Sequence, residues 1–81
     1  MSSMDLTPRQ KADRLLGKAI NHSSNKHADE AKDCLEEAEA ADNDLPYTAW
    51  RFMHVAKTCD PTGSEFRRYL ELARHELEVG Y

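Results

Sequence analysis

Three cations follow one another along one stripe of the chain's first helical pattern. Lys11, Arg14 and Lys18 recur at spacings of three and four residues, which places them on one helix face. Clustered cations bind acidic peptides, C-terminal carboxylates or phosphates, and arginine binds such groups bidentately. The stripe is therefore a candidate binding surface. The alternative is a solvated face, or one paired with acidic side chains of this chain or another copy.

The next segment has the opposite charge. Residues 26–44 hold eight acids against two lysines, a net charge of −6 within a chain of net −4. Asp33, Glu36 and Glu37 mark the outward side of the predicted helix in this segment. One interpretation is an acidic surface that meets a basic partner, as on a small phage inhibitor or decoy that blocks a host protein. The other interpretation is solubility alone.

Aromatic side chains gather in the third helical pattern. Trp50, together with Met53, is expected in the core, whereas Tyr47 and Phe52 point away from it. With Val55 these two would form an exposed apolar patch, as interfaces often have. The alternative is that all of the aromatic residues are core. In either case this helix is the preferred surface for self-association or a partner.

The sequence gives little sign of a metal or catalytic centre. His22 with His27, and His54 with Cys59, have ligand-like spacing, but neither has the second pair that zinc sites usually show. No glycine-rich phosphate loop or nucleophile motif is present in the sequence. We therefore predict no metal ligands, no cofactor and no enzymatic activity.

Size and composition set the broad class. The 81 residues predict one domain, 1–81, with a small core and a thin margin of stability, which self-association would widen. A net charge of −4 argues against direct nucleic-acid binding. Two cysteines, and the absence of a long apolar run, predict a reduced, cytoplasmic protein without a membrane segment.

Four helices are predicted to position these residues, over 7–21, 26–42, 46–58 and 62–79. Apolar residues recur at three- and four-residue spacing in each, and none shows sustained alternation, so the fold class is all-α. Thr7 with Gln10, and Thr62 with Glu65, have the spacing of capping boxes at two helix starts. The expected architecture is two stacked antiparallel hairpins or a small helical bundle.

A weak internal repeat favours the stacked hairpins. Glu30, Leu35, Glu36 and Ala38 return 35 residues later as Glu65, Leu70, Glu71 and Ala73. With Leu16-Gly17 and the aromatic spacing of the second half, the chain resembles a pair of degenerate tetratricopeptide repeats. The resemblance implies a shared binding groove formed by the first helix of each pair. The groove residues would be Lys11, Arg14, Lys18, Arg51, Val55 and Thr58.

These observations predict a small non-enzymatic helical module that binds a protein or peptide and self-associates. Two alternatives stay open. One is the phage-type inhibitor acting through the acidic helix. The other is a binder of a small anionic ligand such as a nucleotide, held by Lys11, Arg14 and Lys18 with stacking from Tyr47 or Trp50.

Overall fold

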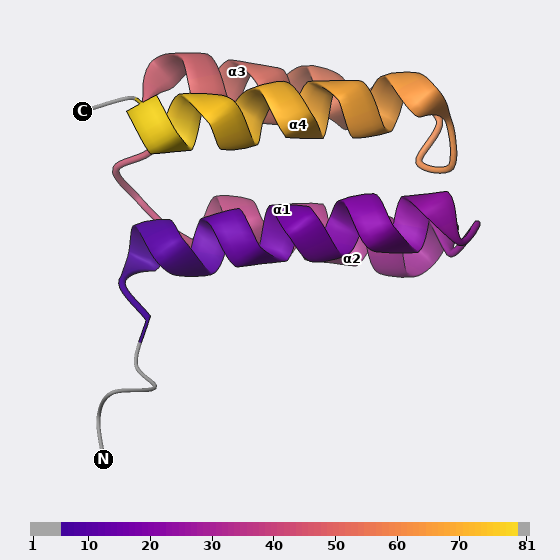
Figure 1. The fold of residues 1–81 in the computed structure, drawn as a ribbon, viewed down its shortest axis with the longest axis horizontal. Helices are drawn as coiled ribbons and strands as arrows, with labels where there is room; N and C mark the ends of the chain where they lie inside the picture. The colour runs from indigo at the N-terminus through magenta and orange to yellow at the C-terminus, as the bar shows by residue number, and fades with distance from the viewer. Residues whose placement is uncertain (1–5, 80–81) are drawn as a thin grey trace.

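A computed structural model describes residues 6–79 and contains four helices (Figure 1). These are α1 (Pro8–Ser24), α2 (Ala28–Ala41), α3 (Tyr47–Ala56) and α4 (Ser64–Val79). No strand occurs in the described part of the chain, so the predicted all-α fold is confirmed. Within residues 6–79, none of the helices combines the length and the apolar character that a membrane span requires.

The helices form two antiparallel hairpins that make a small four-helix bundle. α1 packs along α2, α3 packs along α4, and the two hairpins join mainly where α1 lies beside α4. α1 and α4 lie at the front of Figure 1, with α2 and α3 behind them. α2 and α3 touch only slightly, and α1 does not contact α3. The bundle is therefore closed along the α1–α4 side and open along the α2–α3 side.

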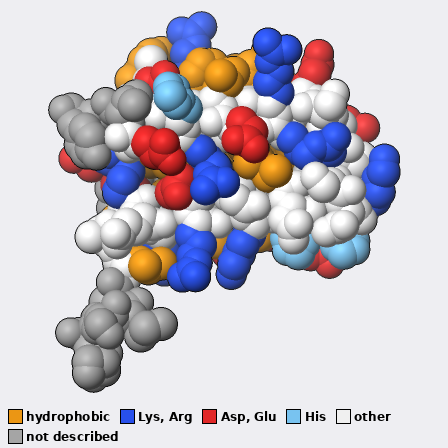
Figure 2. Space-filling model, in the orientation of Figure 1, with side chains coloured by type: hydrophobic (Ala, Val, Ile, Leu, Met, Phe, Trp, Pro, Cys, Tyr) orange, Lys and Arg blue, Asp and Glu red, His pale blue; other side chains and the backbone are white. Residues whose placement is uncertain are grey.

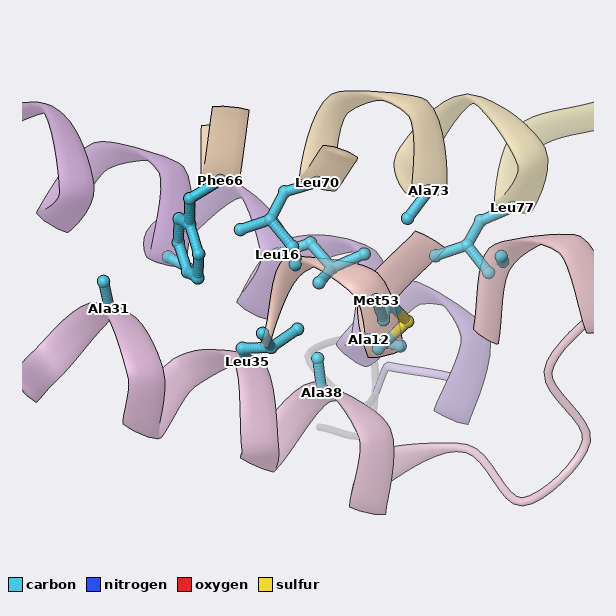
Figure 3. Close-up of a cluster of buried hydrophobic side chains, with 13 residues drawn as sticks. Ala12, Leu16, Ala31, Leu35, Ala38, Met53, Phe66, Leu70, Ala73 and Leu77 are labelled. Carbon is cyan, nitrogen blue, oxygen red and sulfur yellow. The ribbon is translucent and has the colours of Figure 1, made fainter. Parts of the chain in front are cut away.

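The core is built from one narrow stripe on each helix and is rich in alanine. Alanine contributes little apolar area but lets the backbones of paired helices approach closely, and the larger side chains fill the centre (Figure 3). The buried apolar residues are Ala12, Leu16, Ala19, Ala31, Leu35, Ala38, Ala49, Met53, Ala56, Phe66, Leu70, Ala73 and Leu77.

One of the two predicted capping boxes is present. The Thr7 hydroxyl oxygen accepts a hydrogen bond from the Gln10 amide at 3.1 Å, and the Thr7 amide donates to Gln10 Oε1 at 3.0 Å. The Thr62–Glu65 box is wrong. Thr62 instead donates both its amide and its hydroxyl to the Asp60 carboxylate, each at 3.0 Å, which makes a turn and delays the start of α4 to Ser64.

α1 runs three residues beyond its predicted end at residue 21. Ser23, expected in the break, is fully buried, and it accepts a 3.1 Å hydrogen bond from Arg67 of α4. Tertiary packing thus extends the helix by another turn. The helix ends at Ser24, and Lys26, two residues further on, has a φ of 65° in the left-handed region. The other helix bounds differ from the predicted ones by at most two residues.

An ion pair and a glycine close the α1–α4 side. Arg74 of α4 donates from Nε to Asp13 Oδ1 of α1 at 3.0 Å. Its guanidinium lies across Gly17, where an added Cβ would stand 3.1 Å from Arg74 Nη1. The missing side chain at residue 17 therefore gives the arginine a flat surface on α1.

Candidate functional site

The open side of the bundle carries a groove between α2 and α3. Two adjoining hollows, which share Lys57, make up this α2–α3 groove. The larger hollow measures about 530 Å³, which is room for side chains of a docked segment. The α2 side of the whole groove includes Lys32, Glu36 and Glu39, and Leu35 and Leu45 also line the groove.

Three rings stack along the α3 wall of the groove. Tyr47 and Trp50 have ring centroids 6.0 Å apart, and Trp50 and His54 have theirs 5.0 Å apart, with nearly parallel planes. Residues three and four apart lie on one helix stripe, so α3 itself aligns this aromatic ladder of Tyr47, Trp50 and His54. Tyr47 is 66% exposed and Trp50 is 40% exposed. A large aromatic surface is thus left in solvent beside a hollow.

A buried carboxylate anchors one end of the groove. Asp42 follows α2, is only 6% exposed, and accepts a 2.7 Å bond from Arg9 Nε of α1. Its other oxygen accepts the Asp44 amide at 2.8 Å. The hydrogen bond from Arg9, and then that from the Asp44 amide, lower the pKa of Asp42 below its usual value. Asp42 is therefore a structural anion that fixes the α2–α3 connection.

A second ion pair spans the groove. Lys57, which follows α3, donates from Nζ to Glu39 Oε1 of α2 at 2.8 Å. The remaining acids of the α2 surface reach outward: Asp33 and Glu36 are exposed, and Glu36 lines the groove. Glu37 is exposed as well, but it lies on the α1 side of α2, in a hollow with Lys11 and Leu15. The predicted acidic surface is thus split between two faces of one helix.

The predicted basic stripe lies away from the groove. Lys11, Arg14 and Lys18 are all exposed on α1. Arg14 and Lys18 line a hollow between α1 and α4, whereas Lys11 lines the one between α1 and α2. Figure 2, which views the α1–α4 face, shows lysine and arginine side chains gathered over it.

The α3 members of the predicted shared groove lie elsewhere. Arg51 is exposed on α3 and Val55 is half-buried, and α3 does not touch α1. The structure therefore does not bring the basic stripe together with Arg51 and Val55, or with the rings of Tyr47 and Trp50 that would stack on a nucleotide.

Two aromatic residues exchange the roles that the sequence predicted for them. Trp50, expected in the core, is 40% exposed, and Phe52, expected outside, packs half-buried against the core with its ring 6.2 Å from that of Tyr69. Both flank the buried stripe of Ala49 and Met53. The Phe52 side meets α4 and the Trp50 side meets the open groove. The periodicity of the sequence predicts the buried stripe of α3, but it does not predict which side of that stripe a neighbouring helix covers.

The cysteines do not form an activated nucleophile. Burial raises the pKa of the Cys34 thiol, and the nearby carboxylate of Glu37 raises it further, so the thiolate is disfavoured. Cys59 donates a weak bond from its thiol to the Val55 carbonyl oxygen at 3.6 Å. Both thiols are free.

Comparisons with known proteins add no relative to these observations. No protein-family model, curated protein or solved structure matches the chain. The tetratricopeptide resemblance stays a prediction. The candidate site therefore depends on the α2–α3 groove itself, with its exposed rings and its two walls.

Proposed function

We propose that the chain is a non-enzymatic protein-interaction module that self-associates through the α2–α3 groove in the cytoplasm. Two copies face each other about a two-fold axis parallel to the groove, so that α2 of each lies over α3 of the other. The observation that carries this proposal is the exposed aromatic ladder on the α3 wall of the groove, which faces Glu36 and Glu39 on the α2 wall. The partner predicted for the module is thus a second copy.

Charge selects this arrangement of the two copies. α2 contains six acids and one lysine, whereas α3 contains one arginine and no acid, and Lys57 follows it. An axis along the groove sets Glu36 of one copy opposite Lys57 of the other, and two equivalent contacts form at once. An axis across the groove would set α2 against α2 and bring like charges together.

The aromatic ladder supplies the apolar centre of the same surface. Tryptophan and tyrosine are the residues that most often dominate the binding energy of an interface when they become buried. The two larger extents of the described chain, 36 and 27 Å, give its α2–α3 face room for the roughly 800 Å² that each partner contributes to a standard interface.

The fluorescence of Trp50 tests the proposal directly, because it is the only tryptophan in the chain. We expect sedimentation equilibrium to give a dimer, and we expect the Trp50 emission to shift to the red on dilution as the indole becomes exposed. A chain that remains monomeric as concentration rises, with an unchanged emission spectrum, contradicts self-association.

Charge reversal tests the orientation. Glu36→Arg and Lys57→Glu should each weaken the dimer at least about tenfold, because both residues line the groove and each change places like charges in both copies of the contact. The double variant should recover most of the loss. Glu37→Arg is the matched control, since Glu37 lies on the same helix but outside the groove. Equal weakening by Glu37→Arg, or no recovery in the double variant, argues against this pairing of helices.

A further inference from the structure

Two imidazoles face each other at the turn between α1 and α2. His22 lies in the last turn of α1, and His27 directly precedes α2. Their Nδ1 atoms are 3.4 Å apart, and the ring centroids are 5.6 Å apart with the planes tilted by 42°. His22 is half-buried and His27 is exposed.

The end of α1 holds the backbones of this pair in place. The His27 amide donates to the His22 carbonyl oxygen at 2.8 Å, and the Lys26 amide donates to that of Ser23 at 3.1 Å. These two bonds are the pair that closes a helix ending in a left-handed residue, here Lys26. Such an ending brings the side chains at the His22 and His27 positions together, and that contact is usually apolar. In this chain two metal-binding side chains occupy it instead.

We propose that His22 and His27 form a binding site for a borderline divalent metal ion, with Zn²⁺ as the reference ion. Two Zn–N bonds of about 2.0–2.1 Å at a tetrahedral angle place their nitrogens about 3.3–3.4 Å apart. The observed Nδ1 separation of 3.4 Å meets this requirement without movement of the backbone. Imidazole nitrogen prefers zinc, copper and nickel, whereas magnesium and calcium prefer oxygen.

The chain supplies two ligands at this site. No group of three or more histidine, cysteine or acidic side chains is placed to hold a metal within the described residues. Water therefore completes the coordination, and the site is an accessible two-histidine site rather than a closed structural one. Each Nδ1 must offer its lone pair to the metal, so both imidazoles bind it as the tautomer that carries the ring proton on Nε2.

Titration of the full chain with zinc chloride, followed by calorimetry and by the histidine NMR signals, tests this site. We expect one Zn²⁺ per chain, with the signals of His22 and His27 shifting together, and no binding of Mg²⁺. His22→Ala and His27→Ala should each reduce the affinity by at least the roughly 10–100-fold that loss of an outer-sphere partner costs. His75→Ala, which removes an exposed histidine of α4 outside the groove, is the matched control and should bind as the parent does.

The outcomes separate the site from its competitors. A ratio of one ion per two chains that still requires both histidines supports the site, with four imidazoles from two copies around the metal. Binding that survives either histidine substitution but is lost in Cys34→Ser or Cys59→Ser overturns it in favour of the thiols. Absence of heat and of shifted signals at a large excess of zinc also overturns it, and leaves the 3.4 Å contact as a hydrogen bond between the two rings. Circular dichroism of each variant verifies that the helices are retained.

Discussion

Replacing Arg9 by methionine should destabilise the fold through a carboxylate far away in the sequence. Arg9 lies near the start of α1, yet its Nε donates to Asp42 Oδ2 at 2.7 Å and its Nη2 to the Asp44 carbonyl oxygen at 2.8 Å. Methionine keeps much of the aliphatic stem but removes both donors. Asp42, only 6% exposed, would then keep a single bond, from the Asp44 amide.

The size of the loss follows from the environment of the two groups. A hydrogen bond to a charged group contributes about 1.5–3 kcal/mol when its partner is left desolvated. Arg9 itself is 31% exposed, so water screens part of the attraction and favours the lower half of that range. We expect a loss of about 2 kcal/mol in the free energy of unfolding at pH 7, or a fall of about 8–16 °C in Tm for a chain of this size.

The same contact sets the sign of a pH dependence. Arg9 lowers the pKa of Asp42 in the folded chain below that of an unfolded aspartate, which is about 3.9. In the interval between the two pKa values the unfolded chain binds more protons, so stability rises with pH. The contribution of Asp42 is therefore complete well above pH 4 and is lost as the pH falls through its folded pKa. The difference in stability between the parent and Arg9→Met should shrink in parallel.

Urea unfolding followed by circular dichroism at pH 7, 5 and 3.5 measures both quantities. Arg14→Met is the matched control, because Arg14 is exposed on the same helix and makes no hydrogen bond or ion pair within residues 6–79. Its effect should stay within about 0.5 kcal/mol at each pH. The reasoning is refuted if the two variants lose equal stability at pH 7, or if the loss in Arg9→Met does not change on acidification.

Three further substitutions test the packing. Lys26→Gly should stabilise the chain by about 1 kcal/mol in urea unfolding, because only glycine adopts a φ of 65° without strain, and Lys26→Ala should not. Gly17→Ala should raise the free energy of unfolding by about 0.5 kcal/mol, since the gain in helix propensity exceeds the cost of shifting the flexible end of Arg74; a drop in Tm would mean that Arg74 cannot move. Phe66→Ala should cost about 3–5 kcal/mol, and retention of a cooperative thermal transition near the parent Tm would contradict its place at the centre of the core.

The helices were predicted well from local signals in the sequence, because each signal depends only on residues a few positions apart along the chain. The Thr7–Gln10 capping box and the buried stripes of α1 and α2 follow from spacing alone. The end of α1 did not follow, because Ser23 is buried and accepts a hydrogen bond from Arg67, which lies 44 residues further along the chain. A serine in a run of polar residues predicts the end of a helix, and only the tertiary structure shows that it is buried.

The candidate site was harder to predict for the same reason. Periodicity correctly predicted that Tyr47 is exposed, but it placed Trp50 in the core. Trp50 lies beside the buried stripe of α3, and such a residue belongs to the core only if a neighbouring helix covers that side. Only the pairing of helices shows that α4 covers the Phe52 side of α3 and leaves the Trp50 side open. The Lys11–Arg14–Lys18 stripe was found from spacing, whereas its separation from Arg51 depends on α1 and α3 lying diagonally across the bundle.

The closed and open sides of the bundle differ in the size of the side chains placed on them. Where α1 meets α4, Gly17 lets a flat guanidinium lie against the helix and bond to Asp13. On the α2–α3 side, Trp50 stands at the rim and Lys57 reaches across to Glu39. Glycine and alanine let paired helices approach closely. The large Trp50 ring and the long Lys57–Glu39 pair instead keep α2 and α3 further apart. The groove is thus specified by the sequence, and the dimer that we propose would need no separation of the helices.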